Sequence, residues 1–152
     1  MKRVSLWGAL FAIVLAIATQ AAFARAIDTK RFELAEQYMM LMNAKEYKKA
    51  YALLAWKISY TDFLVRVESS NKAFAEQLSE QGVDLQSRKV ERVTPMTFED
   101  KYIIVNVDSS FTGTRKGTKE KVTDTVHYQV YFRFNEKGLI DLVNGIGEGW
   151  MC

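Results

Sequence analysis

The stretch VTDTVHYQVYFRF, residues 122–134, alternates between apolar and polar side chains. One face would carry Val126, Tyr128, Val130, Phe132 and Phe134, and the other Thr125, His127, Gln129, Tyr131 and Arg133. Alternation over this length is typical of a strand with one buried and one solvated face. The stretch therefore predicts the longest strand of an antiparallel sheet, whose apolar face needs a cover.

Three further strands are predicted around it, at residues 83–94, 102–111 and 139–146. Residues 112–118 hold two glycines and two charges, which predicts a hairpin connection. Residues 135–138 (NEKG) predict the turn before the last strand. The first strand leads into Pro95, the single proline of the chain, so we expect it at or near an edge of the sheet.

The segment before the strands carries apolar residues at three- and four-residue steps, which is typical of amphipathic helices. Asp28, Asn43 and Ser59 are the expected N-cap residues of three successive helices. Gly82 is the expected end of the third helix. Ser69-Ser70-Asn71 interrupts that helix, which leaves two shorter helices as an alternative. Three N-terminal helices packed on a bent four-stranded antiparallel sheet form an α+β domain.

The N-terminus has the three parts of a secretory signal peptide. Lys2 and Arg3 precede an apolar run at residues 4–18, and Ala22-Phe23-Ala24 supplies a small-x-small cleavage pattern. We expect cleavage after this pattern, which leaves residues 25–152 as one domain in the periplasm or outside the cell. The alternative is an uncleaved membrane anchor, although a spanning helix needs about 20 apolar residues.

Charge and composition argue against several kinds of partner and site. Removal of the leader lowers the Lys and Arg count from 21 to 19, against 18 Asp and Glu, so no nucleic-acid partner is expected. Cys152 is the single cysteine and could only pair with another chain or remain a tail thiol. With one histidine and no His/Cys cluster, neither a metal nor a cofactor is expected. Met39, Met40 and Met42 do not share one helix face, which favours core packing over a copper site.

The order of elements resembles the nuclear-transport-factor-like α+β cone superfamily, which includes ketosteroid-isomerase-like and SnoaL-like proteins. Residues 43–54 (NAKEYKKAYALL) are similar to the second-helix phrase common in that superfamily. Residues 61–63 (TDF) and 85–90 (LQSRKV) resemble elements of small secreted bacterial families of this fold. The resemblance implies a cone-shaped pocket between sheet and helices, and often a homodimer through the outer face of the sheet.

Site residues follow from this resemblance and from the strand alternation. The expected ligand pocket is aromatic, with Tyr38, Tyr51, Phe63, Tyr128 and Phe132. The only acid and donor expected to point inward together, as an isomerase site requires, are Asp141 and Tyr128; a solvent-facing Asp141 is the alternative. The expected dimer or partner face consists of His127, Gln129, Tyr131 and Arg133, and Cys152 is the candidate for an intermolecular disulfide.

Three functions stay open on this basis. The first is a non-enzymatic exported module, expected to be a homodimer, that binds a small apolar ligand or an envelope protein. It would have no contact with the membrane after cleavage. The second is a small-molecule enzyme of the isomerase or cyclase type. The third is a component of an envelope or secretion assembly, held at the membrane by its N-terminus.

Overall fold

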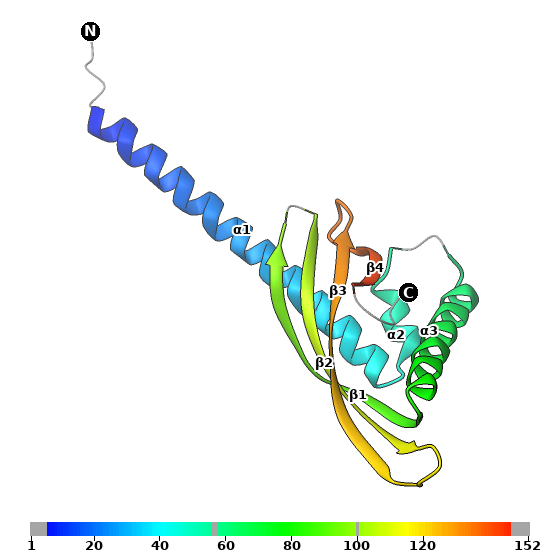
Figure 1. Cartoon of the computed structure of the whole chain (residues 1–152). Helices are drawn as coiled ribbons and strands as arrows, with labels where there is room; N and C mark the ends of the chain where they lie inside the picture. The colour runs from blue at the N-terminus through cyan, green and yellow to red at the C-terminus, as the bar shows by residue number, and fades with distance from the viewer. Residues whose placement is uncertain (1–5, 56–57, 100, 147–152) are drawn as a thin grey trace.

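The computed structural model describes residues 6–55, 58–99 and 101–146, and their side chains from residue 25 to residue 144. The helices are α1 (Leu6–Asn43), α2 (Tyr47–Ala52) and α3 (Tyr60–Glu80). The strands are β1 (Val83–Phe98), β2 (Tyr102–Arg115), β3 (Lys121–Phe134) and β4 (Ile140–Ile146). Figure 1 shows the helices gathered against one face of the curved sheet, with α1 extending well beyond it at its N-terminal end.

The four strands form an antiparallel meander in the order β1-β2-β3-β4, so the predicted α+β architecture is confirmed. β1 is an edge strand, as its proline predicted, although it continues through Pro95 to Phe98. Inward-facing residues of β2 alternate with outward ones, and Ile103, Val105 and Val107 are buried. The prediction from alternation therefore holds for β2 and β3.

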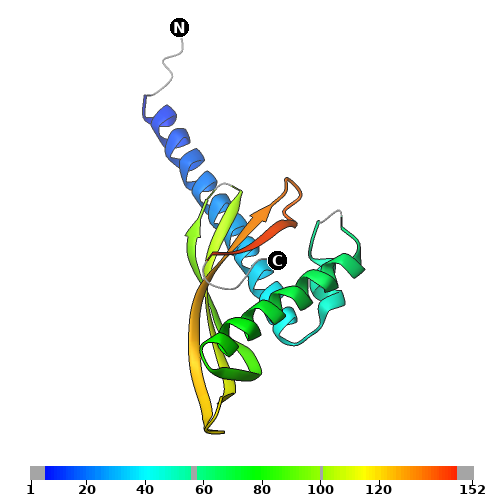
Figure 2. The same ribbon diagram turned by 45° about the vertical axis from the view of Figure 1, so that its right-hand side comes forward.

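β1 does not alternate simply, because it is bulged three times. Gln86, Glu91 and Met96 each have no residue opposite them in the register with β2. The three bulges are five residues apart, and each one shifts the inward-facing set by one position. Bulges bend a strand and increase its twist, so β1 curls around the helices with the rest of the sheet (Figure 2).

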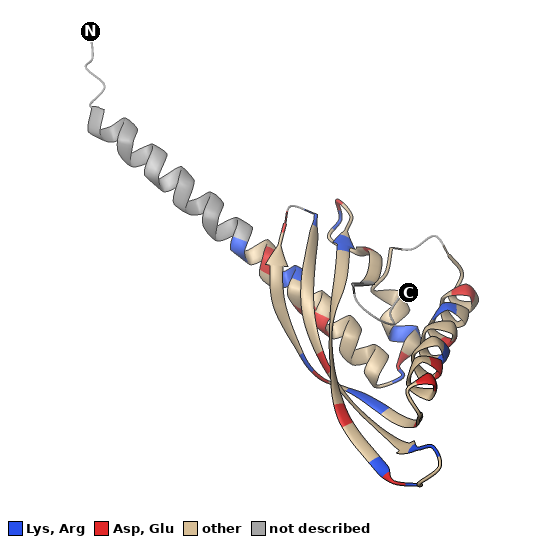
Figure 3. Ribbon diagram, viewed as in Figure 1, with Lys and Arg blue, Asp and Glu red and all other residues tan. Residues whose placement is uncertain are grey.

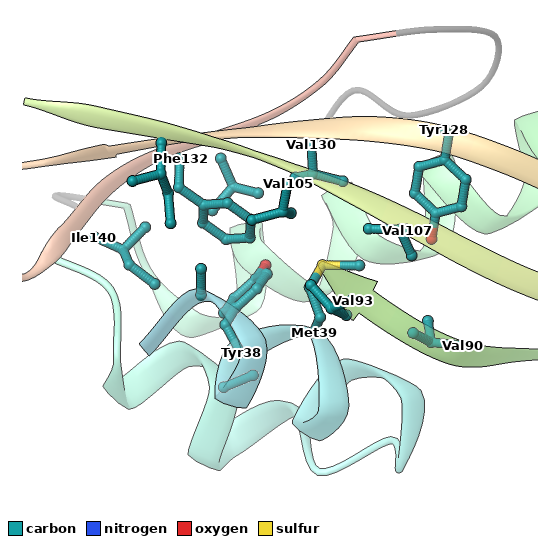
Figure 4. Close-up of a cluster of buried hydrophobic side chains, with 14 of the residues drawn as sticks. Tyr38, Met39, Val90, Val93, Val105, Val107, Tyr128, Val130, Phe132 and Ile140 are labelled. Atoms are coloured by element: carbon teal, nitrogen blue, oxygen red, sulfur yellow. The ribbon is translucent and has the colours of Figure 1, made fainter. Parts of the chain in front are cut away.

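Two clusters of buried side chains hold the helices on the sheet. In the larger cluster, Tyr38 and Met39 of α1 point into the inner face of the sheet (Figure 4). The ring of Tyr38 meets that of Phe132 edge to face, with 5.9 Å between centroids. In the smaller cluster, Phe74 of α3 packs edge to face on Phe111 of β2 at 6.3 Å. Thus α1 and α3 cover different parts of one apolar face.

Two of the three predicted helix starts are wrong. Asp28 lies inside α1, which continues through residues 19–27 because these hold no proline or glycine and are rich in alanine. Asn43 is the last residue of α1, and its Oδ1 accepts a hydrogen bond from Val90 N of β1 at 2.8 Å. The chain then turns at Lys45, whose φ is 59°, and Glu46 precedes α2 without a side-chain capping bond.

The third helix start is confirmed. Ser59 Oγ accepts a hydrogen bond from Asp62 N at 3.1 Å and caps α3. Gly82, with φ of 82°, follows the end of the helix as expected. α3 is a single helix of 21 residues, with Ser70 buried beneath it, so Ser69-Ser70-Asn71 does not divide it. Among the residues described, no helix combines the length and the hydropathy needed to cross a membrane.

Replacement of Asn43 by Ala should lower the free energy of unfolding by about 1–3 kcal/mol, because the partly buried N–H of Val90 loses its acceptor. Asn43→Asp keeps an acceptor oxygen and should lower the free energy of unfolding by less. Asn144→Ala, an exposed change on β4, serves as control. Urea denaturation of the three variants measures the free energy of unfolding. Equal losses in Asn43→Ala and Asn43→Asp would contradict the stabilising role of the Asn43–Val90 hydrogen bond.

Candidate ligand cavity

A cavity of about 300 Å³ opens where α1, α3 and β1 diverge. α1 contributes Met39 and Met42, α3 contributes Val67 and Ser70, and β1 contributes Arg88 and Val90. This volume lies at the lower end of the range found for small-molecule sites. None of the described residues that line the cavity is an Asp, a Glu or a His.

Local sequence determines where the cavity lies. The Asn43–Val90 hydrogen bond fixes the end of α1 against the edge strand β1. The bulge at Gln86 then bends β1 away toward α3, and α3 packs on the smaller cluster. The helices therefore separate over the sheet at Arg88, and the space between them is not filled by side chains.

Arg88 is the main charged group at the inner end of this site. Its guanidinium carbon lies 4.0 Å from the ring centroid of Phe74 and 5.0 Å from that of Tyr128. All three guanidinium nitrogens are buried. Burial lowers the pKa of Arg88 below its ordinary value, while the charge and hydrogen bond of the Tyr128 hydroxyl act in the opposite direction. Aromatic faces stabilise a cation in such a position.

Three buried hydroxyls lie in or near the site. The Tyr128 hydroxyl and Ser109 Oγ lie 3.1 Å apart, and both residues are buried on the inner face of the sheet. Ser70 faces the cavity from α3 and is 7% exposed. Within the described structure, Ser70 Oγ has no hydrogen-bond partner. A buried hydroxyl in that state needs a water or a ligand as its partner.

The predicted aromatic pocket residues do not line this cavity. Tyr38 and Phe132 are 1% and 0% exposed and belong to the larger buried cluster. Phe63 packs against Tyr51, with 5.4 Å between ring centroids, in a separate contact of α2 with α3. Only Tyr128 adjoins the site, through Arg88. Aromatic side chains near the middle of a sheet have filled its core, because they bury the largest apolar area.

Asp141 and Tyr128 do not come together. Asp141 Oδ1 accepts a hydrogen bond from Arg133 Nε at 2.8 Å, which raises the pKa of Arg133, whereas Tyr128 points into the molecule. The register explains this separation: Leu142 pairs with Arg133 and Ile140 with Phe134, so Asp141 lies in a bulge. The prediction of an inward-facing acid beside Tyr128 is therefore wrong.

The predicted partner face does lie on the outside of the sheet. His127 Nδ1 is 2.8 Å from Asp108 Oδ1, and Arg92 binds the other oxygen of the same carboxylate. Gln129 donates to the Met96 sulfur at 3.0 Å. Further along the face, the rings of Tyr131 and Tyr102 lie 4.8 Å apart, and Arg133 pairs with Asp141. The role of His127, Gln129, Tyr131 and Arg133 in a dimer stays a prediction.

The remaining predictions concern metal binding, the methionines and Cys152. Within the described part of the chain, no three His, Cys, Asp or Glu side chains are placed to hold a metal ion. Met39 is 3% exposed and Met40 is 46% exposed, so these methionines lie on different helix faces, as the spacing predicted. Cys152 lies outside the described residues.

The sequence contained one signal for the site that simple alternation missed. Arg88 stands within the segment LQSRKV, where Leu85 and Val90 face inward. Regular alternation from Leu85 would turn Ser87 inward and Arg88 outward. The bulge at Gln86 reverses this assignment, and one charged residue thereby enters the inner face.

No family model matches the sequence, and no curated protein is similar to it. Two solved structures share the architecture. A candidate polyketide cyclase from Xanthomonas campestris pv. campestris superposes with a TM-score of 0.53 and 10% identity, over 78% of this chain and 90% of that one. A candidate polyketide cyclase from Pseudomonas putida KT2440 superposes with a TM-score of 0.51 and 16% identity, over 78% and 91%. At these identities the likeness shows the fold alone, and it confirms the cone fold expected from the order of elements.

Stability at low pH should depend on Asp108. Hydrogen bonds from His127 and then from Arg92 hold the pKa of this carboxyl below its ordinary value of 3.8. A lowered pKa in the folded state gives stability that is present above the unfolded pKa and is lost as the pH falls through the folded pKa. Asp108→Asn should therefore be less stable than wild type at pH 7, and the difference should shrink below about pH 3.8.

Thermal unfolding of both proteins between pH 7 and pH 2.5 measures this difference. A variant with Arg92→Ala and His127→Ala removes both donors, and in that background Asp108→Asn should have little pH-dependent effect. A difference between Asp108→Asn and wild type that is constant across the pH range would contradict the prediction.

Proposed function

We propose that this chain is an exported, non-enzymatic protein that binds a small, largely apolar molecule in the cavity between α1, α3 and β1. The observation that carries the proposal is the cavity itself, about 300 Å³ in volume, whose lining combines methionine, valine and leucine side chains with a similar number of polar ones. Small-molecule sites combine apolar walls, which supply affinity, with polar groups that orient the ligand.

The methionines support a binding role. Met39 and Met42 enter the cavity from the last turns of α1, and their unbranched side chains adapt to ligands of different shape. Val67 and Val90 form firmer walls on the two other elements. The apolar part of a ligand that contacts all four side chains would be shielded from water by α1, α3 and β1.

Isomerase or cyclase activity is the alternative, and the names of the two fold neighbours favour it. Proton abstraction most often uses a carboxylate or an imidazole near the reacting atom. The described cavity lining offers neither, although acidic and basic side chains are interspersed along α3 and the strands (Figure 3). Binding is thus the function that the described lining supports best.

Export is proposed from the N-terminal sequence. Lys2, Arg3, the apolar run and Ala22-Phe23-Ala24 follow one another in the order of a signal peptide. Among the described side chains of α1, the first one packed against the larger cluster is Phe32. Cleavage after Ala24 would leave this packing in place.

Binding can be tested with N-phenyl-1-naphthylamine, a neutral probe that fluoresces in apolar sites. Val67 is buried in the cavity wall, so Val67→Phe should fill the cavity and weaken binding of the probe at least about tenfold. The matched control is Val65→Phe on the same helix, where Val65 is 60% exposed; this variant should bind as wild type does.

Because a larger side chain at Val67 can disturb the core, Met42→Trp offers a second block, nearer the partly exposed rim. Circular dichroism and thermal unfolding establish that each variant is folded. Undiminished probe binding in both folded variants would exclude this cavity as the site.

Export predicts a definite mass. Protein from a periplasmic extract, measured intact without reductant, should begin at Arg25. A doubled mass that collapses on reduction would assign Cys152 to a link between two chains. A full-length species confined to the membrane fraction would contradict cleavage and support the alternative of a membrane-held assembly component.

A further inference from the structure

The charged residues that line the cavity, among those described, have one sign. Lys45 lies exposed beside the opening, at the turn between α1 and α2, and Arg88 lies at the inner end. Elsewhere the described basic side chains are commonly close to acidic ones, as at Arg92 and Asp108. The cavity therefore has a local positive potential, which favours an anionic ligand.

Arg88 is placed to bind an anion in a site shielded from water. Its guanidinium lies against the rings of Phe74 and Tyr128 and hydrogen-bonds with the Tyr128 side chain. Arginine carries five N–H donors in a planar fork that matches charged oxygen groups. Hydrogen bonds between an arginine and a charged oxygen group are stronger than neutral ones, particularly away from water.

Ser70 gives an independent indication of a polar ligand group. It is 93% buried, since 7% of its surface is exposed, and its Oγ has no hydrogen-bond partner in the described structure. Ser70 belongs to α3 and Arg88 to β1, so the two side chains reach the same cavity from opposite walls. A hydroxyl can donate to the same oxygen group that an arginine binds.

The guanidinium nitrogens of Arg88 and Ser70 Oγ are buried, so a ligand can reach them only if the wall between α3 and β1 opens. At this end α3 contacts the sheet through the smaller cluster of Phe74, Leu78 and Phe111. Folded proteins open locally at a lower free-energy cost than global unfolding.

We propose that the cavity takes a small organic anion, whose charged oxygen group binds Arg88 and Ser70 while its apolar body lies against Met39, Met42 and Val67. This inference rests on the proposed function, since it specifies the chemical class of the ligand for the same cavity.

The test uses two probes with the same apolar body. 8-Anilino-1-naphthalenesulfonate carries a charged oxygen group, and N-phenyl-1-naphthylamine lacks it. Arg88→Met should raise the Kd of the anionic probe about tenfold and leave that of the neutral probe within about twofold, because a charge-assisted hydrogen bond is lost. Ser70→Ala should act in the same direction with a smaller effect.

The matched control is Arg92→Met, which removes an exposed arginine from the same strand and should change neither Kd. Arg88→Lys keeps the charge and should restore part of the preference for the anionic probe. Decanoate should displace the neutral probe from wild type better than from Arg88→Met, whereas decan-1-ol should not discriminate. The two competitors extend the test from a sulfonate to a carboxylate.

The outcomes separate the two proposals. If a folded Arg88→Met variant loses affinity for both probes equally, or keeps its affinity for the anionic probe, the anion assignment is overturned. Neither result contradicts the proposed binding function. Failure of wild type to bind either probe would count against both proposals. If the neutral probe binds wild type and Val67→Phe with the same Kd, its site lies elsewhere and both proposals are overturned.

Discussion

The structure depends on one constraint, which is that the apolar face of the sheet is longer than a single helix covers. β2 and β3 have 14 residues each, which is about 46 Å of strand. The part of α1 that packs on the larger cluster, residues 32–42, spans only about 16 Å. α3 therefore covers the remaining part, around Phe111, and forms its own cluster there. The cavity is the gap between the two covered areas.

The bulges of β1 adapt the sheet to this arrangement. An edge strand can be bulged without breaking pairing on a second side, and each of the three bulges lets β1 curl further around the helices. They also select the side chains on each face. Arg88 turns inward after the bulge at Gln86, whereas Glu91 projects outward, where hydrogen bonds from Lys89 and Ser110 lower its pKa. The polar outer face and the charged cavity therefore share one structural origin.

Local sequence rules predicted the fold where local interactions decide it. Alternation in residues 122–134 predicted β3 to within one residue, and Ser59 with Asp62 predicted the start of α3. The same rules failed where a distant partner decides. Asn43 has the side chain of an N-cap but binds Val90, which lies 47 residues away. Likewise, Asp141 lies in a bulge and accepts a hydrogen bond from Arg133. The bulge is visible only in the pairing of β3 with β4.

The cavity was beyond sequence reasoning for the same reason, and its central residue shows what is gained from the structure. A buried charge is not required for stability at such a position, because an apolar side chain of similar volume often packs as well or better. Phe74 and Tyr128 offer an apolar environment that methionine or leucine would fill without any cost of desolvation. Arginine brings instead a fixed positive charge to the inner end of a cavity between α1, α3 and β1. We attribute the desolvation cost of Arg88 to anion recognition, because its interaction with an anion is strongest away from water.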